Sequence, residues 1–108
     1  MEHLAEKKCI PCEAGVKAFD KAKAVEMLSQ LNGWTLNEAG TEISREFKFK
    51  NFFRTMSFVN AVAHIANHEN HHPDMKVGFN YCHLVFTTHA IDGLSENDFI
   101  CAAKVDKL

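Results

Sequence analysis

Histidines gather in one short stretch of the chain. The sequence holds seven of them, and four lie between residues 64 and 72. Imidazole has an unperturbed pKa near neutrality, so it can take up or release a proton at pH 7 at little cost. Acid–base catalysis by such a group typically contributes about 10²–10⁴-fold to a rate. A reaction that removes one proton and delivers another would need two imidazoles, one in each protonation state.

Three histidines lie where predicted elements end. His71 and His72 stand before Pro73, whose ring disfavours a helical conformation in the preceding residue, so a predicted helix ends here. His89 stands at the end of a predicted strand. Because side chains alternate along extended backbone, His71 and His72 are expected to point apart. The clustering makes these three histidines candidate site residues, with a purely structural role as the alternative.

A metal site is the first competing interpretation. His64 and His68 are four residues apart on a predicted helix and can share one face, as the histidines of the zinc-protease motif do. Ile65, however, stands where that motif has its glutamate. Cys9 and Cys12 form a CxxC, which alone is half of a zinc site. We therefore predict no bound metal and no cofactor, with His64 and His68 on the solvent side of their helix.

The bulk composition excludes several classes of partner. A formal net charge of −2 offers no electrostatic basis for binding nucleic acid or an anionic membrane. No apolar run approaches the roughly 20 residues that cross a bilayer. Residues 1–8 have no apolar stretch like that of a signal peptide. We therefore expect a cytoplasmic protein, whose four cysteines are free thiols in a reducing compartment.

The first half of the chain predicts a helix followed by a hairpin. Asp20 is a good N-cap, and Gly33 suits the left-handed conformation in which helices commonly end. Residues 34–36 start a short strand. Between residues 43 and 50, apolar and polar side chains alternate, which predicts an amphipathic strand. The apolar positions of the helix are Ala24, Met27, Leu28 and Leu31.

The second half predicts a helix, a second hairpin and a last helix. Asn51 can cap a helix of about 17 residues that ends before Pro73. Strands are predicted at residues 75–79 and 81–89. Ser95 and Asp98 fit a capping box at the start of the last helix. The apolar faces of the two helices consist of Phe52, Met56, Val59, Ala63 and Ala66, and of Phe99, Ile100, Ala103 and Val105.

Together these elements predict one α+β domain. The order α-β-β-α-β-β-α favours a four-stranded antiparallel sheet with helices packed on one face. A chain of 108 residues is long enough for one domain and too short for two. Residues 19–108 are expected to form this domain. Residues 1–18, dominated by Lys, Glu, Pro and Gly, are expected to form a flexible leader.

The spacing of the candidate residues resembles the signature of the pterin-4a-carbinolamine dehydratase family. His71-His72-Pro73 is followed by Phe79, His89 and Asp98 at the intervals of that signature. Residues 33–34, 47–52, 87–89 and 93–98 also look like family motifs. The resemblance covers roughly residues 20–105, and the cysteine-containing leader looks like that of bacterial members. One departure is Asn67, which stands where the family often has a charged residue.

The resemblance implies an assembly and an activity as well as the fold above. Family members form dimers or tetramers, which implies a homodimer or homotetramer here. The implied activity is that of a hydro-lyase, which dehydrates a 4a-hydroxytetrahydropterin to quinonoid dihydropterin and recycles the pterin cofactor of aromatic amino-acid hydroxylases. The pterin is then the small-molecule partner. The alternatives are a non-enzymatic interaction protein, like the animal members that bind a homeodomain transcription factor, and another pterin-related role.

The resemblance also implies roles for individual residues. The implied catalytic residues are His71, His72 and His89, with His71 and His89 assigned to the two proton transfers and His72 to holding or polarising the pterin. Trp34 is expected to pack on the pterin ring, with a place in the core as the alternative. Asp98 can orient His89, although capping of the last helix would also explain it. The implied substrate-binding residues are Trp34, Asn70, Pro73, Thr88 and Asp98.

Overall fold

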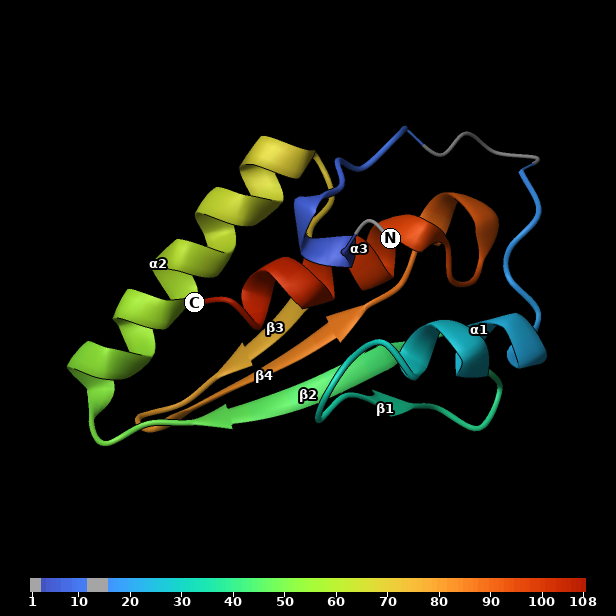
Figure 1. Ribbon diagram of the computed structural model, residues 1–108. Helices are drawn as coiled ribbons and strands as arrows, with labels where there is room; N and C mark the ends of the chain where they lie inside the picture. Colours follow the sequence, from blue (N-terminus) through green and yellow to red (C-terminus); the bar gives the residue numbers. More distant parts are fainter. Residues whose placement is uncertain (1–2, 12–15) are drawn as a thin grey trace.

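A four-stranded sheet carries helices on one side (Figure 1). The computed structural model describes residues 3–11 and 16–108. In chain order the elements are η1 (Leu4–Glu6), α1 (Lys21–Leu28), β1 (Thr35–Leu36), β2 (Ile43–Lys48), α2 (Phe52–Glu69), β3 (Asp74–Val77), β4 (Tyr81–Phe86), η2 (His89–Ile91) and α3 (Glu96–Val105), where η marks a 3₁₀ helix. The predicted α+β class and the order of helices and strands are confirmed.

The sheet has the strand order β1-β2-β4-β3, and every neighbouring pair is antiparallel. β2 and β4 pair along their whole lengths, from Ile43 opposite Phe86 to Lys48 opposite Tyr81. β1 and β3 are the edge strands. The helical layer therefore packs on the long central pair β2–β4. The chain turns at both ends of this pair and continues into other elements.

β4 ends three residues earlier than predicted, and this moves His89 out of the sheet. Phe86 is the last paired residue because its partner Ile43 is the first residue of β2. Beyond it, Thr88 forms an isolated bridge with Gly93, and residues 89–91 turn as η2. His89 thus lies in a tight turn that projects from the end of the sheet.

The predicted N-terminal helix caps are present, whereas α1 ends at Leu28 with Ser29 as its C-cap and does not reach Gly33. The Asp20 carboxylate accepts from the backbone N–H of Lys23 at 2.8 Å. The Asn51 side chain accepts from the N–H of Arg54 at 2.9 Å. Ser95 and Asp98 form a reciprocal capping box at the start of α3. Each cap satisfies backbone N–H groups that have no partner inside the helix, and so fixes where the helix begins.

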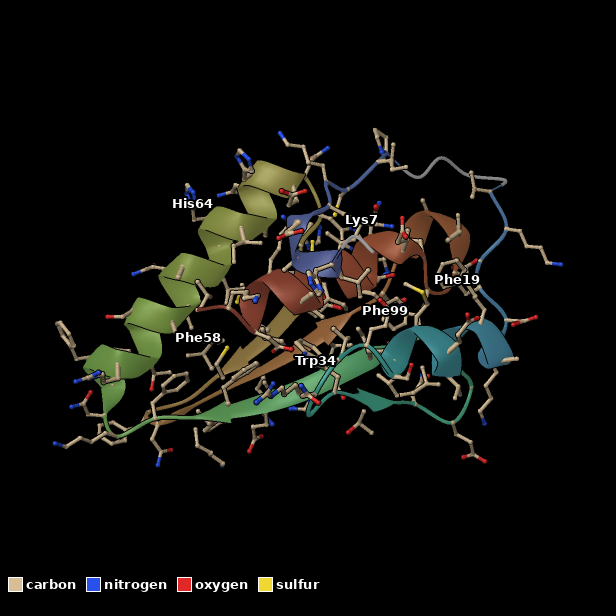
Figure 2. All side chains as sticks on the ribbon, viewed as in Figure 1. Lys7, Phe19, Trp34, Phe58, His64 and Phe99 are labelled. Carbon is tan, nitrogen blue, oxygen red and sulfur yellow. The ribbon has the colours of Figure 1, made fainter. Side chains whose placement is uncertain are left out.

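The core lies between the sheet and α3. Figure 2 shows Trp34 and Phe99 in this layer, and both side chains are buried. β4 buries alternate residues, Cys82, Leu84 and Phe86, as its period of two predicts. α3 is buried along most of its length, from Asn97 to Ala102. The N-terminal turn of α3 is therefore held inside the molecule rather than at its surface.

α2 buries only part of the apolar face that the sequence predicted, since Ala66 is buried and Val59 packs against the core. The buried positions are Thr55, Val62 and Ala66, whereas Phe52 is exposed. Thr55 can be buried because its hydroxyl donates to the backbone carbonyls of Asn51 and Phe79, both at 2.9 Å. α2 thus leaves apolar surface uncovered at its start.

Within the described ranges, no helix is long and apolar enough to cross a membrane.

Residues 3–11 of the predicted leader run along the helices. Leu4 is buried, and Lys104 of α3 donates to the backbone carbonyl of Ala5 at 2.8 Å. Lys7 forms an ion pair with Glu96 at 3.0 Å. The flexibility of residues 1–18 stays a prediction. Cys12, half of the CxxC, lies outside the described residues.

Candidate active site

A cavity of about 480 Å³ opens where α2, η2, the start of α3 and the leader meet. It contains five of the eight predicted site residues: Asn70, His71, His72, Thr88 and His89. Pro73, Trp34 and Asp98 do not line it. The other lining residues are Cys9, Ile10, Pro11, His68, Glu69, Thr87, Ala90 and Asn97. Residues far apart in the sequence therefore converge on one hollow that has both polar and apolar walls.

A sharp turn at the end of α2 directs His71 inward. Asn70 adopts the left-handed conformation, with φ of 54°, and its N–H donates to the carbonyl of Ala66. The N–H of His71 donates to the same carbonyl at 3.1 Å. Asparagine tolerates this conformation better than most residues, which suits it to a helix C-terminus. The role of Asn70 in this structure is to reverse the chain ahead of the histidines.

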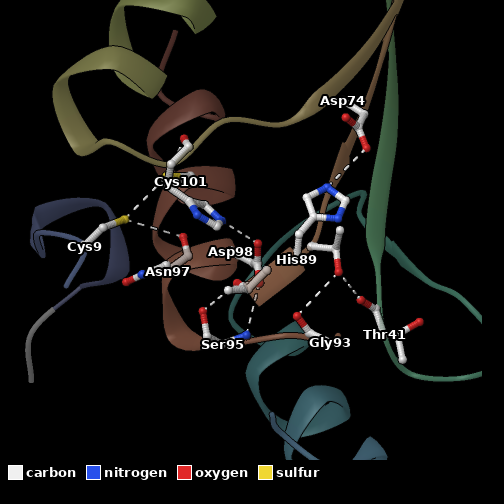
Figure 3. Close-up of polar contacts among 12 residues, drawn as sticks. Cys9, Thr41, Asp74, His89, Gly93, Ser95, Asn97, Asp98 and Cys101 are labelled. Atoms are coloured by element: carbon white, nitrogen blue, oxygen red, sulfur yellow. Dashed lines mark hydrogen bonds and ion pairs between the residues drawn. The ribbon is translucent and has the colours of Figure 1, made fainter. Parts of the chain in front are cut away.

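The imidazole of His71 pairs with a completely buried carboxylate. His71 Nε2 lies 2.6 Å from Asp98 Oδ1, and Asp98 is 0% exposed. Figure 3 shows Asp98 beside Ser95 at the start of α3. The other carboxylate oxygen accepts from the Thr88 hydroxyl at 2.7 Å and from the Ser95 N–H at 3.0 Å. Asp98 was expected to orient His89, but the structure pairs it with His71.

This pairing decides which ring nitrogen of His71 a ligand can use. An ionised carboxylate only accepts hydrogen bonds, so the pairing favours the tautomer in which Nε2 of His71 carries the proton. Nδ1 is then the nitrogen left for a ligand in the cavity. The ring is also stacked against Phe86, with centroids 6.1 Å apart and planes 11° from parallel. The carboxylate contact and the Phe86 ring thereby hold the imidazole in one orientation.

His89 and His72 have more open surroundings. His89 Nε2 lies 3.8 Å from the Asp74 carboxylate, and the side chain is 70% exposed. His72 is also exposed. The cavity therefore combines one fixed, nearly buried imidazole with imidazoles that can exchange protons with water. Such a pair suits a reaction that takes a proton at one point and delivers one at another.

Comparison with known proteins identifies the family. The family model described as pterin 4 alpha carbinolamine dehydratase matches residues 17–108, most of the chain. This chain belongs to the pterin-4-alpha-carbinolamine dehydratase family. The resemblance found in the spacing of His71-His72-Pro73, His89 and Asp98 is thus confirmed.

Relatives and solved structures of this family agree with the fold. Proteins named "Putative pterin-4-alpha-carbinolamine dehydratase" from Nitrosomonas eutropha and Legionella pneumophila are 59% and 55% identical over 106 residues. Each alignment covers 97% of this chain, and 92% and 94% of those proteins. A crystal structure of a transcriptional coactivator/pterin dehydratase from Brucella melitensis matches with a TM-score of 0.79 at 28% identity. That match covers 84% of this chain and 97% of the other.

Trp34 lies in the core, away from the cavity of this family member. Its indole Nε1–H donates to the Asp106 carboxylate at 2.9–3.0 Å, and its ring packs against Phe86 and Phe47. Arg45 also donates to Asp106, at 3.0 Å. Burial nevertheless raises the pKa of Asp106 above its ordinary value. These contacts give Trp34 a structural role that the Gly-Trp motif alone did not reveal.

The helical pair His64 and His68 belongs to the surface of α2. Their rings are stacked with centroids 6.3 Å apart, and both residues are exposed. In the portion of the chain that the structure describes, no group of three or more His, Cys, Asp or Glu side chains could hold a metal ion. His68 does reach the rim of the cavity.

The leader supplies a wall of the cavity that sequence reasoning missed. Cys9, Ile10 and Pro11 all line it, although the family match begins only at residue 17. Cys9 Sγ also lies 3.5 Å from Cys101 Sγ. This hydrogen bond and burial raise the pKa of the Cys101 thiol well above its ordinary value. A leader without helical or strand periodicity gave no signal for these contacts.

Glu69 holds the leader from the end of α2. Its carboxylate accepts from the Cys9 N–H at 2.9 Å and lies 3.8 Å from the Lys104 ammonium. Burial acts to raise the pKa of Glu69, but the Cys9 N–H and the Lys104 charge outweigh it, so the pKa lies below its ordinary value. The ionised carboxylate is therefore the form that this site favours.

This pKa predicts how the stability of the protein depends on pH. A carboxyl pKa that is lower in the folded state stabilises the fold above the unfolded pKa, and this stabilisation is lost as pH falls through the folded pKa. Glu69→Gln should therefore lower the free energy of unfolding by about 1 kcal/mol near neutral pH. The difference between the two proteins should shrink towards zero as the pH drops below about 4. Urea unfolding at several pH values measures it.

Glu46→Gln is the matched control. Glu46 pairs with Lys48 on the surface, and such exposed pairs contribute little. The two variants should thus differ clearly near neutral pH. An equal effect of both, or a Glu69→Gln effect independent of pH, would contradict the role given to Glu69.

Proposed function

We propose that this protein dehydrates a 4a-hydroxytetrahydropterin to quinonoid dihydropterin and water, with histidines as general acid and base. This hydro-lyase step would recycle the pterin cofactor of aromatic amino-acid hydroxylases. The observation that supports it best is the contact between His71 and Asp98, in which Nε2 lies 2.6 Å from Oδ1. This contact lies beside a cavity that His72 and His89 also line. The names of the close relatives support the same activity. Its proposed location is the cytoplasm, where thiols such as Cys82 and Cys101 stay reduced.

The proposed chemistry moves two protons and breaks one bond. A base takes the proton from ring nitrogen 5, and the electron pair left behind forms the double bond to carbon 4a. The bond from carbon 4a to its hydroxyl oxygen breaks, and an acid protonates the departing hydroxide to water. After each turnover, one catalytic group has gained a proton and the other has lost one. Exchange with solvent restores both.

We assign the base to His71 and the acid to His89. Nδ1 of His71 accepts the proton, and the buried Asp98 carboxylate stabilises the imidazolium that results. His89 is open to solvent and can take up a new proton after each cycle. Asp98 is then a positioning residue, because it is 0% exposed and cannot reach the substrate. His72, Asn70 and Thr88 line the cavity and are proposed to bind the pterin, with Pro73 fixing the backbone beside them.

A non-enzymatic interaction role is the second candidate. The Brucella melitensis structure is described as both a transcriptional coactivator and a pterin dehydratase. A pterin dehydratase-like protein identified as a RuBisCO assembly factor in the alpha-carboxysome shares the fold, with a TM-score of 0.61 at 21% identity. Turnover of a hydroxypterin by the purified protein, or its absence, separates the two candidates.

We further propose that the protein is a homodimer or homotetramer. β3 lies at the edge of the described sheet, so one side of its backbone has no neighbouring strand. Its four residues are all exposed. Large apolar side chains are exposed on the same part of the molecule: Phe52, Phe53, Met75, Val77 and Phe79. The bond from the Thr55 hydroxyl to the Phe79 carbonyl brings the start of α2 next to the β3–β4 turn. A patch of this kind commonly marks an interface.

Light scattering tests this assembly. The mass in solution is expected to equal two or four chains, because association would cover the apolar patch. Phe53→Glu should shift the mass towards a single chain, since Phe53 is 78% exposed and tolerates a charge in the monomer. A wild-type mass of one chain would overturn the proposal.

Activity measurements on variants test the chemistry. Stopped-flow absorbance follows the decay of 4a-hydroxytetrahydropterin with and without protein. The wild-type protein should accelerate the decay, and His71→Ala and His89→Ala should each remove about 10²-fold of the acceleration. His64→Ala is the control, since His64 lies on the exposed face of α2 outside the cavity, and it should leave the rate unchanged. A folded wild-type protein without activity would favour the interaction role instead.

A further inference from the structure

An exposed apolar side chain is held in place at the cavity. Ile10 is 67% exposed, yet its N–H donates to the Asn97 carboxamide oxygen at 3.0 Å, and its carbonyl accepts from the Asn97 amide nitrogen. One asparagine side chain thus engages both backbone groups of Ile10, as a neighbouring strand would. The isoleucine nevertheless stays mostly exposed.

Further contacts fix the chain on the approach to Ile10. The carboxylate of Glu69 accepts from the Cys9 N–H, and Lys104 connects the same carboxylate to the backbone of Ala5. Leu4 is buried in the core cluster. The leader is therefore attached to both α2 and α3 before it reaches the cavity. Fixing several residues of chain costs conformational entropy, which these polar contacts offset without burying Ile10.

We propose that Ile10 and Pro11 form the apolar wall of the pterin pocket, and that Asn97 and Glu69 are positioning residues that hold this wall in place. The inference rests on the proposed function and adds a specificity element to it. The histidine side of the cavity carries polar groups from His71 and His72, which can bind the polar edge of a pterin. The leader side carries hydrocarbon, which can pack on the flat face of the ring.

The wall contributes to binding and not to proton transfer. Neither Ile10 nor Pro11 has a group that can exchange a proton, so their effect should appear in KM and in the Kd of a stable ligand. Removing most of the Ile10 side chain takes away apolar contact worth about a three- to tenfold change in affinity. The value of kcat should stay within about twofold, because His71 and His89 are unchanged.

Two variants test the wall. In Ile10→Ala, an exposed side chain is shortened, so the fold should be unaffected while KM rises about three- to tenfold. In Asn97→Asp, a carboxylate replaces the amide that donates to the Ile10 carbonyl and so repels that carbonyl. An acid in the first turn of α3 favours the helix, so the protein should still fold. Its KM should rise by at least as much as in Ile10→Ala, again with little change in kcat.

Asn32→Asp is the matched control, because Asn32 is exposed and does not line this cavity. Thermal unfolding of all variants checks the fold. Calorimetric titration with 7,8-dihydropterin gives the Kd without turnover. The proposal predicts weaker binding by Ile10→Ala and Asn97→Asp and unchanged binding by Asn32→Asp.

The outcomes separate this inference from the proposed function. An active wild-type protein whose KM and Kd are unchanged in both leader variants would overturn the wall and leave the dehydratase proposal intact. A wild-type protein that binds dihydropterin without turnover, with weaker binding in the variants, would overturn the dehydratase activity and support the wall. A wild-type protein that neither binds nor turns over a pterin would overturn both.

Discussion

The buried carboxylate of Asp98 joins the parts of the structure that build the site. It accepts from Ser95 at the start of α3, from Thr88 after β4 and from His71 after α2. Burying a charge away from water is costly unless hydrogen bonds and opposite charge compensate it. Here the compensation comes from the two donors, the imidazole, and the positive end of the α3 dipole. Three chain segments must therefore meet at one point before the carboxylate is satisfied.

Because three segments meet at Asp98, this residue has two roles. As the third residue of α3, Asp98 completes the capping box that starts the helix. As the partner of His71, it sets which ring nitrogen faces the cavity. The preceding residue, Asn97, points to a different side of the helix and holds Ile10 of the leader. The first turn of α3 thus organises the histidine side and the leader side of the cavity together.

The sequence predicted the elements well because their signals are local. Asp20, Asn51 and the Ser95–Asp98 box mark helix starts by contacts within a few residues. The alternation in β4 directly reports which side faces the core. The position of His71 and His72 at the end of a helix followed from the same local patterns, whereas His89 lies in the turn η2 and not at the strand end that was predicted. All three reach one cavity in the structure.

What the sequence could not predict depends on contacts between distant residues. Asp98 was expected to serve His89, which is closer in sequence, yet it pairs with His71 across 27 positions. Trp34 was expected at the pterin ring, but its indole binds Asp106 at the far end of the chain. The leader carries no periodic pattern, and single polar contacts with Glu69 and Asn97 hold it. The burial of Thr55 in α2 likewise depends on a distant partner, because its hydroxyl donates to the Phe79 carbonyl.

The claim on which this account rests is that Asp98 holds His71 with a proton on Nε2. Nuclear magnetic resonance of protein with ¹⁵N-labelled histidine measures this directly, and His71→Gln identifies the resonances of His71. We predict a proton on Nε2 that exchanges slowly with solvent and resonates far downfield, and its loss in Asp98→Asn. An unprotonated Nε2 in the wild-type protein, or the same protected proton in Asp98→Asn, would contradict the account.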